Sequence, residues 1–528
     1  MWIALCAFCA SLWFSCSVYA QALPNEAAEA DARKAVAANP KDADAHALLA
    51  VILDQRGQPD EAEREYQTAL QLKPNLVSAL SNYGVLLART SRPADAIAKF
   101  EEVLRIDPKH ERAIFNLGAL YAAVSDYERA VPLLEKAVGQ PACKSEPGDR
   151  ALLLTLVNAY AHIDRRQDAL SLARCLEETS AGDARILFTL ALSLAEAHEY
   201  AEAVRLFRRT NELRPNTYEV LYNLGLALYN LDRLSEATEA LSAAKKLKPA
   251  EADPLYRLGL VASAQNDTKA ALMYWMQALE LRSLFPEVNF MIGEELLKTR
   301  LPEKSIPFYE LALEQSKGQL VYHLRLGVAF VRAQFYERAR EVFTRALERY
   351  PDNANLYFLL GYSARAEGQY DQAVAAFQKV LKLEPDNPDA IANLGYIASQ
   401  RGENAEAERL LRRAIQLNPQ AFPSYHDLGR LLVKLKRYDE ALPLLKRGVE
   451  LNDKDPGIRY QLFLAYSRLK QKAEADKELA EFKRLEEINR HGATPLGAAL
   501  KPSSGMEGET LPPLPATASG DTAKPRTP

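Results

Sequence analysis

The sequence has few of the features on which catalytic or disulfide-built proteins depend. It contains 5 cysteines in 528 residues, and three of them lie within the first twenty residues, so disulfides do not build this fold. Its 7 histidines are scattered, and no two of them have metal-ligand spacing such as HExxH. It has neither a phosphate-binding loop nor a dinucleotide-binding glycine fingerprint. We therefore expect no cofactor, no metal and no catalytic residues, and a protein that is not an enzyme.

Charge of one sign and long apolar runs are also scarce. The net charge of −4 gives no general attraction to nucleic acid, so we expect no such partner. Only residues 1–20 form an apolar run long enough to cross a membrane. We predict a signal peptide ending at Ala20, with an uncleaved anchor or a lipid attached to Cys16 as alternatives. Each of these three alternatives predicts an exported protein, periplasmic or secreted, that contacts the membrane only through its leader, residues 1–20.

An internal repeat dominates the rest of the chain. Glycines recur at one constant interval through the second half, and the same frame extends in both directions with a single irregular step, between Gly118 and Val157. Thirteen units cover residues 43–489, with an insertion at 141–149. A small residue stands twelve positions after the glycine, a large apolar residue follows four positions later, and many units close with proline. The glycines are Gly84, Gly118, Gly225, Gly259, Gly293, Gly327, Gly361, Gly395 and Gly429.

This pattern resembles the tetratricopeptide repeat, a unit of about 34 residues with glycine, alanine, aromatic and proline positions. The spacing of apolar residues such as Leu221, Leu224 and Leu228 independently indicates one face of a helix. A polar break, as at 366–369, and a closing proline divide each unit into two helices. One pair cannot bury its own apolar face, so pairs must stack. We predict an all-α fold, an α-solenoid superhelix of thirteen antiparallel helix pairs.

The two ends of the mature chain differ from the repeats. Residues 21–42 contain a predicted helix, at 25–39, that caps the first unit. The unusually charged residues 472–490 are predicted to form the helix that closes the last unit. Residues 490–528 are rich in proline, glycine, serine and threonine, a composition that cannot form a packed core. We predict a disordered tail there.

The resemblance implies that the first helices of the units line a concave groove, in which a protein or peptide partner binds. Aromatic residues recur three positions before the glycine, where they form either core packing or a sticky floor. Basic residues of the later first helices form a stripe that favours an acidic partner, unless it is a solvated face with local ion pairs. The candidate binding residues are Phe188, Tyr222, Tyr256, Arg257, Phe290, Lys298, Arg325, Arg332, Phe358, Arg365, Arg430 and Lys434.

Asparagines and cysteines supply two further candidates. Four units carry asparagine two positions before the glycine, at Asn82, Asn116, Asn223 and Asn393. The position resembles the asparagine ladder of peptide-gripping arrays, but four of thirteen units do not predict a continuous ladder. Outside the leader, Cys143 in the insertion and Cys175 on a second helix can form a disulfide in an oxidising compartment, with two free thiols as the alternative.

The sequence thus favours a non-catalytic scaffold that binds a protein or peptide and holds an envelope or secretion complex together. One alternative is a carrier for an acidic polymer, such as an anionic polysaccharide during export. Another is the regulatory subunit of a separately encoded enzyme. The dependence of binding on salt separates the first two, because screening weakens binding through a basic stripe.

Overall fold

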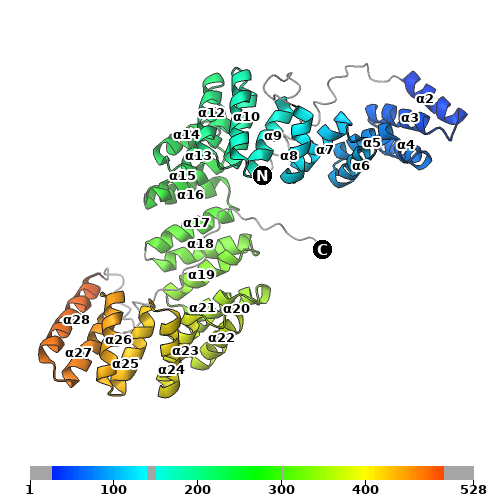
Figure 1. Ribbon diagram of the computed structural model, residues 1–528. Coiled ribbons are helices and arrows are strands. Elements are labelled where there is room, and N and C mark those ends of the chain that lie inside the picture. Colours follow the sequence, from blue (N-terminus) through cyan, green and yellow to red (C-terminus); the bar gives the residue numbers. More distant parts are fainter. Residues whose placement is uncertain (1–25, 140–149, 300, 493–528) are drawn as a thin grey trace. The chain divides into compact units, whose positions relative to one another are not determined.

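The computed structural model describes residues 26–139, 150–299 and 301–492. These residues form 27 helices and no strand, and the helices follow one another in pairs (Figure 1). The predicted all-α stack of helix pairs is therefore confirmed. No helix in these ranges combines the length and hydrophobicity needed to cross a membrane. The chain divides into two compact units, Met1–Ser283 and Leu284–Pro528, and we describe each by itself.

The first unit contains one lone helix and seven helix pairs. The lone helix α2, Glu26–Ala38, lies where a capping helix is predicted and packs on α3. Within each pair the helices are joined by three residues, so they run antiparallel. The pairs are α3 Ala43–Gln55 and α4 Pro59–Leu72; α5 Val77–Arg89 and α6 Pro93–Ile106; α7 Glu111–Ala123 and α8 Tyr127–Val138; α9 Arg150–His162 and α10 Arg166–Thr179; α11 Ala184–Glu196 and α12 Tyr200–Leu213; α13 Tyr218–Asn230 and α14 Leu234–Leu247; α15 Asp253–Ala264 and α16 Thr268–Leu281.

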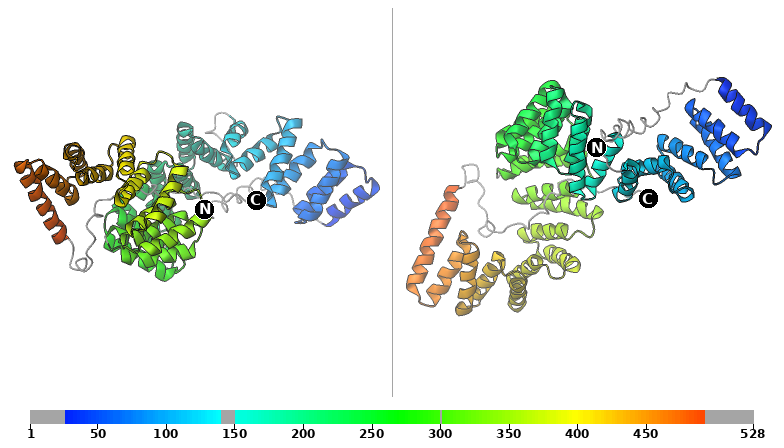
Figure 2. Two further views of the ribbon diagram at one scale, coloured as in Figure 1. Left: turned by 90° about the horizontal axis from the view of Figure 1, so that it is seen from below. Right: turned by 45° about the horizontal axis from the view of Figure 1, so that its top comes forward.

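The second unit contains six pairs. Figure 2 shows its last helix, α28, coloured orange-red, at the end of this stack. The pairs are α17 Pro286–Lys298 and α18 Pro302–Gln315; α19 Leu320–Arg332 and α20 Tyr336–Arg349; α21 Ala354–Ala366 and α22 Tyr370–Leu383; α23 Pro388–Arg401 and α24 Asn404–Leu417; α25 Phe422–Lys434 and α26 Tyr438–Leu451; α27 Pro456–Arg468 and α28 Lys472–Gly492.

In the pairs that have the glycine of the repeat, it meets the large apolar residue sixteen positions later in the core of the pair. A methyl group added to Gly293 would lie 2.7 Å from a ring carbon of Tyr309, far inside van der Waals contact. The rings of Tyr309 and Phe343 are fully buried at this position. Glycine therefore lets the first helix approach the ring closely, which explains why the two positions recur together.

Each pair whose turn is described passes through one residue in the left-handed conformation. The residue after it closes a six-residue turn, as where the backbone N–H of Arg233 donates to the carbonyl of Leu228 at 3.0 Å. This is the Schellman form of helix ending. Residue 300, at the equivalent position of the eighth pair, lies outside the described part of the chain. The turn residues are Gly57, Ser91, Ser125, Asp164, His198, Asp232, Asn266, Gln334, Gly368, Gly402, Lys436 and Lys470.

Ion pairs connect consecutive second helices on the surface. Arg338 contacts Glu310 at 2.8 Å, and Arg437 contacts Glu408 at 2.6 Å. Exposed pairs of this kind contribute about 0–1 kcal/mol each. Their main effect is that charged side chains of the second helices are paired with one another within the stack. Further pairs between neighbouring repeats are Arg33–Glu61, Arg92–Glu63, Arg129–Glu101, Arg165–Glu135, Arg205–Glu177, Arg208–Glu236 and Arg412–Glu440.

Cys175 lies buried on α10 and is disulfide-bonded. Its predicted partner, Cys143, lies outside the described residues, so the pairing stays a prediction. We expect an alkylating reagent to leave Cys175 unmodified in unfolded, unreduced protein and to modify it after reduction, because only a free thiol reacts. Peptide mapping under both conditions reads the result. Alkylation of Cys175 before reduction would contradict the bridge.

Candidate functional site

Several aromatic residues three positions before the glycine pack between helices. The ring centroids of Phe188 and Phe207 lie 5.8 Å apart, and those of Phe290 and Tyr309 also lie 5.8 Å apart. Phe290 is only 8% exposed. This geometry fits core packing, the alternative to a sticky floor.

Tyr222 and Tyr256 in the first unit are only half-buried, and Arg257 contacts both. The Nε of Arg257 donates to the hydroxyl of Tyr222 at 3.3 Å. The guanidinium also lies 5.1 Å from the centre of the Tyr256 ring. The hydroxyl of Tyr222 and the ring of Tyr256 thus hold the Arg257 side chain in place, the ring through a cation–π contact.

Most basic residues of the predicted stripe already have partners. Lys434 lies 3.4 Å from the carbonyl oxygen of Ser399. Arg332 is exposed and makes no hydrogen bond or ion pair with the rest of the described chain. This geometry fits the alternative to a binding stripe, a solvated face with local ion pairs. The carboxylate pairs are Lys298–Glu295 at 2.8 Å, Arg325–Glu294 at 3.1 Å and Arg430–Asp427 at 2.9 Å.

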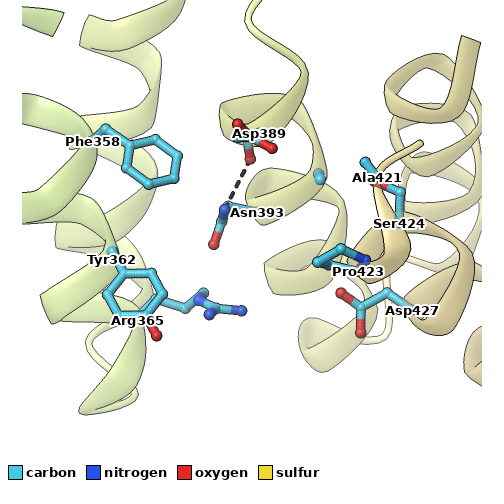
Figure 3. A pocket seen from close by; sticks show the side chains of 10 residues that line it. Phe358, Tyr362, Arg365, Asp389, Asn393, Ala421, Pro423, Ser424 and Asp427 are labelled. Carbon is cyan, nitrogen blue, oxygen red and sulfur yellow. Dashed lines mark hydrogen bonds between the residues drawn. The ribbon is translucent and has the colours of Figure 1, made fainter. Parts of the chain in front are cut away.

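Groove residues converge in a hollow, open to solvent, on three consecutive first helices of the second unit (Figure 3). It brings together two residues of the predicted set, Phe358 and Arg365, both from α21. Helix α23 and the beginning of α25 supply the other sides. The lining consists of Phe358, Tyr362, Arg365, Asp389, Ala392, Asn393, Ala421, Pro423, Ser424 and Asp427.

Stacked aromatic and guanidinium groups fix one end of this hollow. The guanidinium of Arg365 lies 4.7 Å from the centre of the Tyr396 ring and 5.2 Å from that of Tyr362. Arg430 contacts the same Tyr396 ring at 5.2 Å. Arg365 is 7% exposed, so its position is set by packing as well as by charge. Residues that look unrelated in sequence thus form one cluster.

Asn393 occupies the middle of the hollow and has an unused hydrogen-bonding atom. Its Nδ2 donates to the backbone carbonyl of Asp389 at 2.8 Å, drawn as a dashed line in Figure 3. Because that partner is an acceptor, it fixes which end of the amide is nitrogen. The Oδ1 is buried and accepts no hydrogen bond from any described residue. A buried acceptor left unpaired costs about 1–3 kcal/mol, which a donor on a ligand could recover.

Sequence reasoning missed Asp389, which lies at the end of the hollow opposite Arg365 (Figure 3). Its carboxylate makes no ion pair or hydrogen bond within the described chain. More than a third of the residue is accessible to water, yet the surrounding helices desolvate the carboxylate and raise its pKa. A single aspartate among many gave no signal without knowledge of its neighbours.

A second hollow, in the first unit, is less suited to binding a ligand. Helices α10 and α12 and the start of α14 line it, and four arginines face it. Each of these arginines already has a glutamate partner, so the cluster belongs to the surface ion pairs. The pairs are Arg205–Glu177, Arg208–Glu236, Arg209–Glu212 and Arg233–Glu236.

Models of the tetratricopeptide-repeat family match the chain at residues 25–82 and 364–432, at 55–111, 188–252 and 324–368, at 422–455, and at 113–143. Together these segments cover more than half of the chain. The chain is a tetratricopeptide-repeat protein. The family predicted from the period of the repeat is thereby confirmed. None of the curated proteins matches the sequence significantly.

Solved structures of other tetratricopeptide-repeat proteins are similar to this one. YrrB, described as a protein with an unusual peptide-binding site, is 23% identical over 36% of this chain and 97% of its own, with a TM-score of 0.33. The C-terminal part of a repeat protein from Cytophaga hutchinsonii is 15% identical over 46% and 99%, with a TM-score of 0.42. Yeast Tom70 is 15% identical over 87% and 99%, with a TM-score of 0.32.

Proposed function

We propose that this tetratricopeptide-repeat protein is a non-catalytic scaffold that binds an extended peptide segment of a protein partner in the hollow on α21, α23 and α25. The observation that carries the proposal is the buried Oδ1 of Asn393, which accepts no hydrogen bond from the described chain. This oxygen has almost no surface accessible to water in the free protein, so a backbone N–H of an extended peptide would displace the side chains around it in order to donate to it. The bond from Nδ2 to Asp389 holds the amide in place for it.

The rest of the hollow supports a peptide rather than a small ligand. Three consecutive repeats contribute side chains, so a partner that follows the groove meets several of them in succession. Phe358 and Tyr362, both largely buried, offer a small apolar surface, while Asn393 and Asp389 offer acceptors. Such a mixture suits a chain with alternating backbone and side-chain contacts.

The setting that we propose is the cell envelope or a secretion complex. It rests on the apolar leader predicted at residues 1–20, which lies outside the described residues. The acidic polymer carrier gains little support, because most arginines and lysines of the stripe already contact carboxylates or carbonyl groups. Binding to a protein segment therefore stands as the proposed activity.

Peptide binding is expected to weaken when Asn393 is replaced by alanine. Loss of one buried hydrogen bond costs about 1–1.5 kcal/mol, or roughly a five- to tenfold weaker affinity. Peptides selected from a random display library on the full-length protein serve as ligands, and fluorescence polarisation measures their affinity.

Asn223 is the matched control for this experiment. It occupies the same repeat position on α13 and makes the same bond, from its Nδ2 to the carbonyl of Glu219 at 2.7 Å. Asn223→Ala is expected to leave affinity within about twofold, because a contact outside the site adds little. Equal affinity for the wild-type protein and Asn393→Ala would contradict the proposed site, as would a failure to select any peptide.

A further inference from the structure

The repeat itself provides a comparison for Asp389. Three other pairs carry an acidic residue at the same position of the first helix and join it to the lysine or arginine that directly follows their second helix. These ion pairs are Asp44–Lys73 at 3.4 Å, Glu219–Lys248 at 2.9 Å and Asp253–Arg282 at 2.8 Å. The residue that directly follows α24 is Asn418, which carries no charge. The cation that these three acids contact is therefore missing beside Asp389.

One further acid at this position also lacks that cation. Glu287, on α17, is followed at the end of its pair by Ser316. Glu287 lines neither of the two hollows described above. Asp389 thus differs from the other acids at this position because a missing cation and a hollow coincide there.

No other cation of the described chain takes the place of the missing one. Arg413, on the helix that follows, contacts Asp386 at 2.7 Å. Arg365 lies at the other end of the hollow (Figure 3), and its guanidinium contacts the ring of Tyr396. The side chain of Asn418 accepts the backbone N–H of Gln420 at 3.1 Å and so serves its own turn. Asp389 is left as an anionic group facing a hollow that is open to ligands.

We infer that the hollow selects a peptide carrying a lysine or arginine, whose cation contacts Asp389 while a backbone N–H of the same peptide contacts Asn393. The inference rests on the proposed peptide-binding function and narrows the chemistry of the partner. A peptide with a basic side chain is the opposite of the acidic partner expected from the basic stripe.

The surroundings of Asp389 fit such a side chain. Phe358 lies at the same end of the hollow (Figure 3); it is only 6% exposed, and this exposed part is the apolar surface that the methylene stem of a lysine or arginine would contact. Desolvation by the neighbouring helices makes an unpaired carboxylate unfavourable. The interaction of this carboxylate with a cation that enters is therefore stronger than the same interaction in water.

An ordinary structural role for Asp389 makes a different prediction. Asp389 lies in the first turn of α23, where an acid interacts favourably with the helix dipole. That role affects the stability of the helix but not which peptides bind. The choice of peptide is therefore the measurement that separates the two roles.

The test is selection of random dodecapeptides by display on the full-length protein, followed by sequencing of the enriched peptides. We expect lysine or arginine at one fixed position, enriched about fivefold or more over the library, a ratio of the size that one charged contact gives. The isosteric variant Asp389→Asn should lose this preference, and Asp389→Lys should replace it by aspartate or glutamate. Asp253→Asn, which removes the acid at the same repeat position of α15, should keep it.

The outcomes distinguish this inference from the proposed function. If peptides are enriched without a basic position, or if Asp389→Asn keeps the preference, the choice of a cation is wrong and peptide binding stands. Enrichment of acidic residues by the wild-type protein would also overturn the inference and favour the basic stripe. If nothing is enriched, both fail. Thermal unfolding of each variant by circular dichroism shows whether it is folded. If Asp389→Lys does not fold, Asp389→Asn still decides the test.

Discussion

Replacing Phe343 by alanine is expected to lower the free energy of unfolding by about 3–5 kcal/mol. The ring is fully buried between α19 and α20 and lies against Gly327, which has no side chain with which to fill the space. The helices are held apart by the neighbouring pairs on both sides, so collapse around the missing ring is limited. The variant would therefore retain a cavity in addition to losing apolar burial.

Hydrogen exchange of the native protein measures this effect where it occurs, since long repeat arrays do not unfold in a single step. Amides of α19–α21 should lose protection, whereas those of α3–α6 should not, because each pair contacts only its neighbours. Phe343→Leu should cost less, about 1–1.5 kcal/mol, because leucine fills the same position at Leu241, Leu411 and Leu445. Thr344→Ala, at the exposed next residue, should change stability by about 0.5 kcal/mol or less. Equal losses for Phe343→Ala and Thr344→Ala would contradict the packing described here.

Replacing Glu294 by alanine is expected to cost about 2–4 kcal/mol, nearly as much as breaking a buried ion pair. Its carboxylate accepts the hydroxyl of Tyr309 at 2.6 Å and contacts Nε of Arg325 at 3.1 Å. The side chains of Glu294 and Arg325 are 19% and 18% exposed. Burial, assisted by the charge of Glu294, raises the pKa of Tyr309, so the phenol stays a donor. Without Glu294, a cation and a hydroxyl would both lose their partner.

A double-mutant cycle separates the two contacts. Tyr309→Phe removes only the hydroxyl and should cost about 1 kcal/mol. Glu294→Ala and Arg325→Ala together should cost less than the sum of the single changes, because the second change removes the unpaired cation that the first one leaves. Native-state hydrogen exchange of the amides in α17–α19 gives the four values, since it reports the stability of these helices locally. Additive costs would show that Glu294 and Arg325 do not interact in solution.

The helix pairs could be predicted because their signal is local and is repeated thirteen times. The glycine and the large apolar residue sixteen positions later, as in Gly293 and Tyr309, recur at a fixed spacing that the sequence shows, and the structure adds that the two are in contact. The left-handed turns also occur at a fixed spacing, but glycine fills only three of the described ones. The other left-handed turns could not be recognised from the sequence, because residues such as Gln334 and Lys470 do not favour that conformation.

The binding surface was predicted less well because it depends on contacts between repeats. Phe358 and Arg365 were found from their register, and the structure brings both into the hollow. Which basic residues of the stripe have a carboxylate beside them could not be read from composition, as Arg325 shows. Asp389 is recognisable only by comparison with an acid such as Asp253, whose cation lies at the far end of the same helix pair. Such a comparison becomes possible once the structure shows which positions meet.

The left-handed turns have a consequence for the order of the free protein. A residue other than glycine pays about 1–2 kcal/mol for this conformation, so most pairs carry a small built-in strain. Glycine removes it at Gly57, Gly368 and Gly402. Two of these three glycines end α21 and α23, the helices that carry Phe358, Arg365, Asp389 and Asn393. Two of the three helices that line the hollow, α21 and α23, therefore end in unstrained turns, whereas the third, α25, is followed by Lys436 in the left-handed conformation. A partner thus meets a surface built mainly on relaxed turns, with less ordering left to oppose binding.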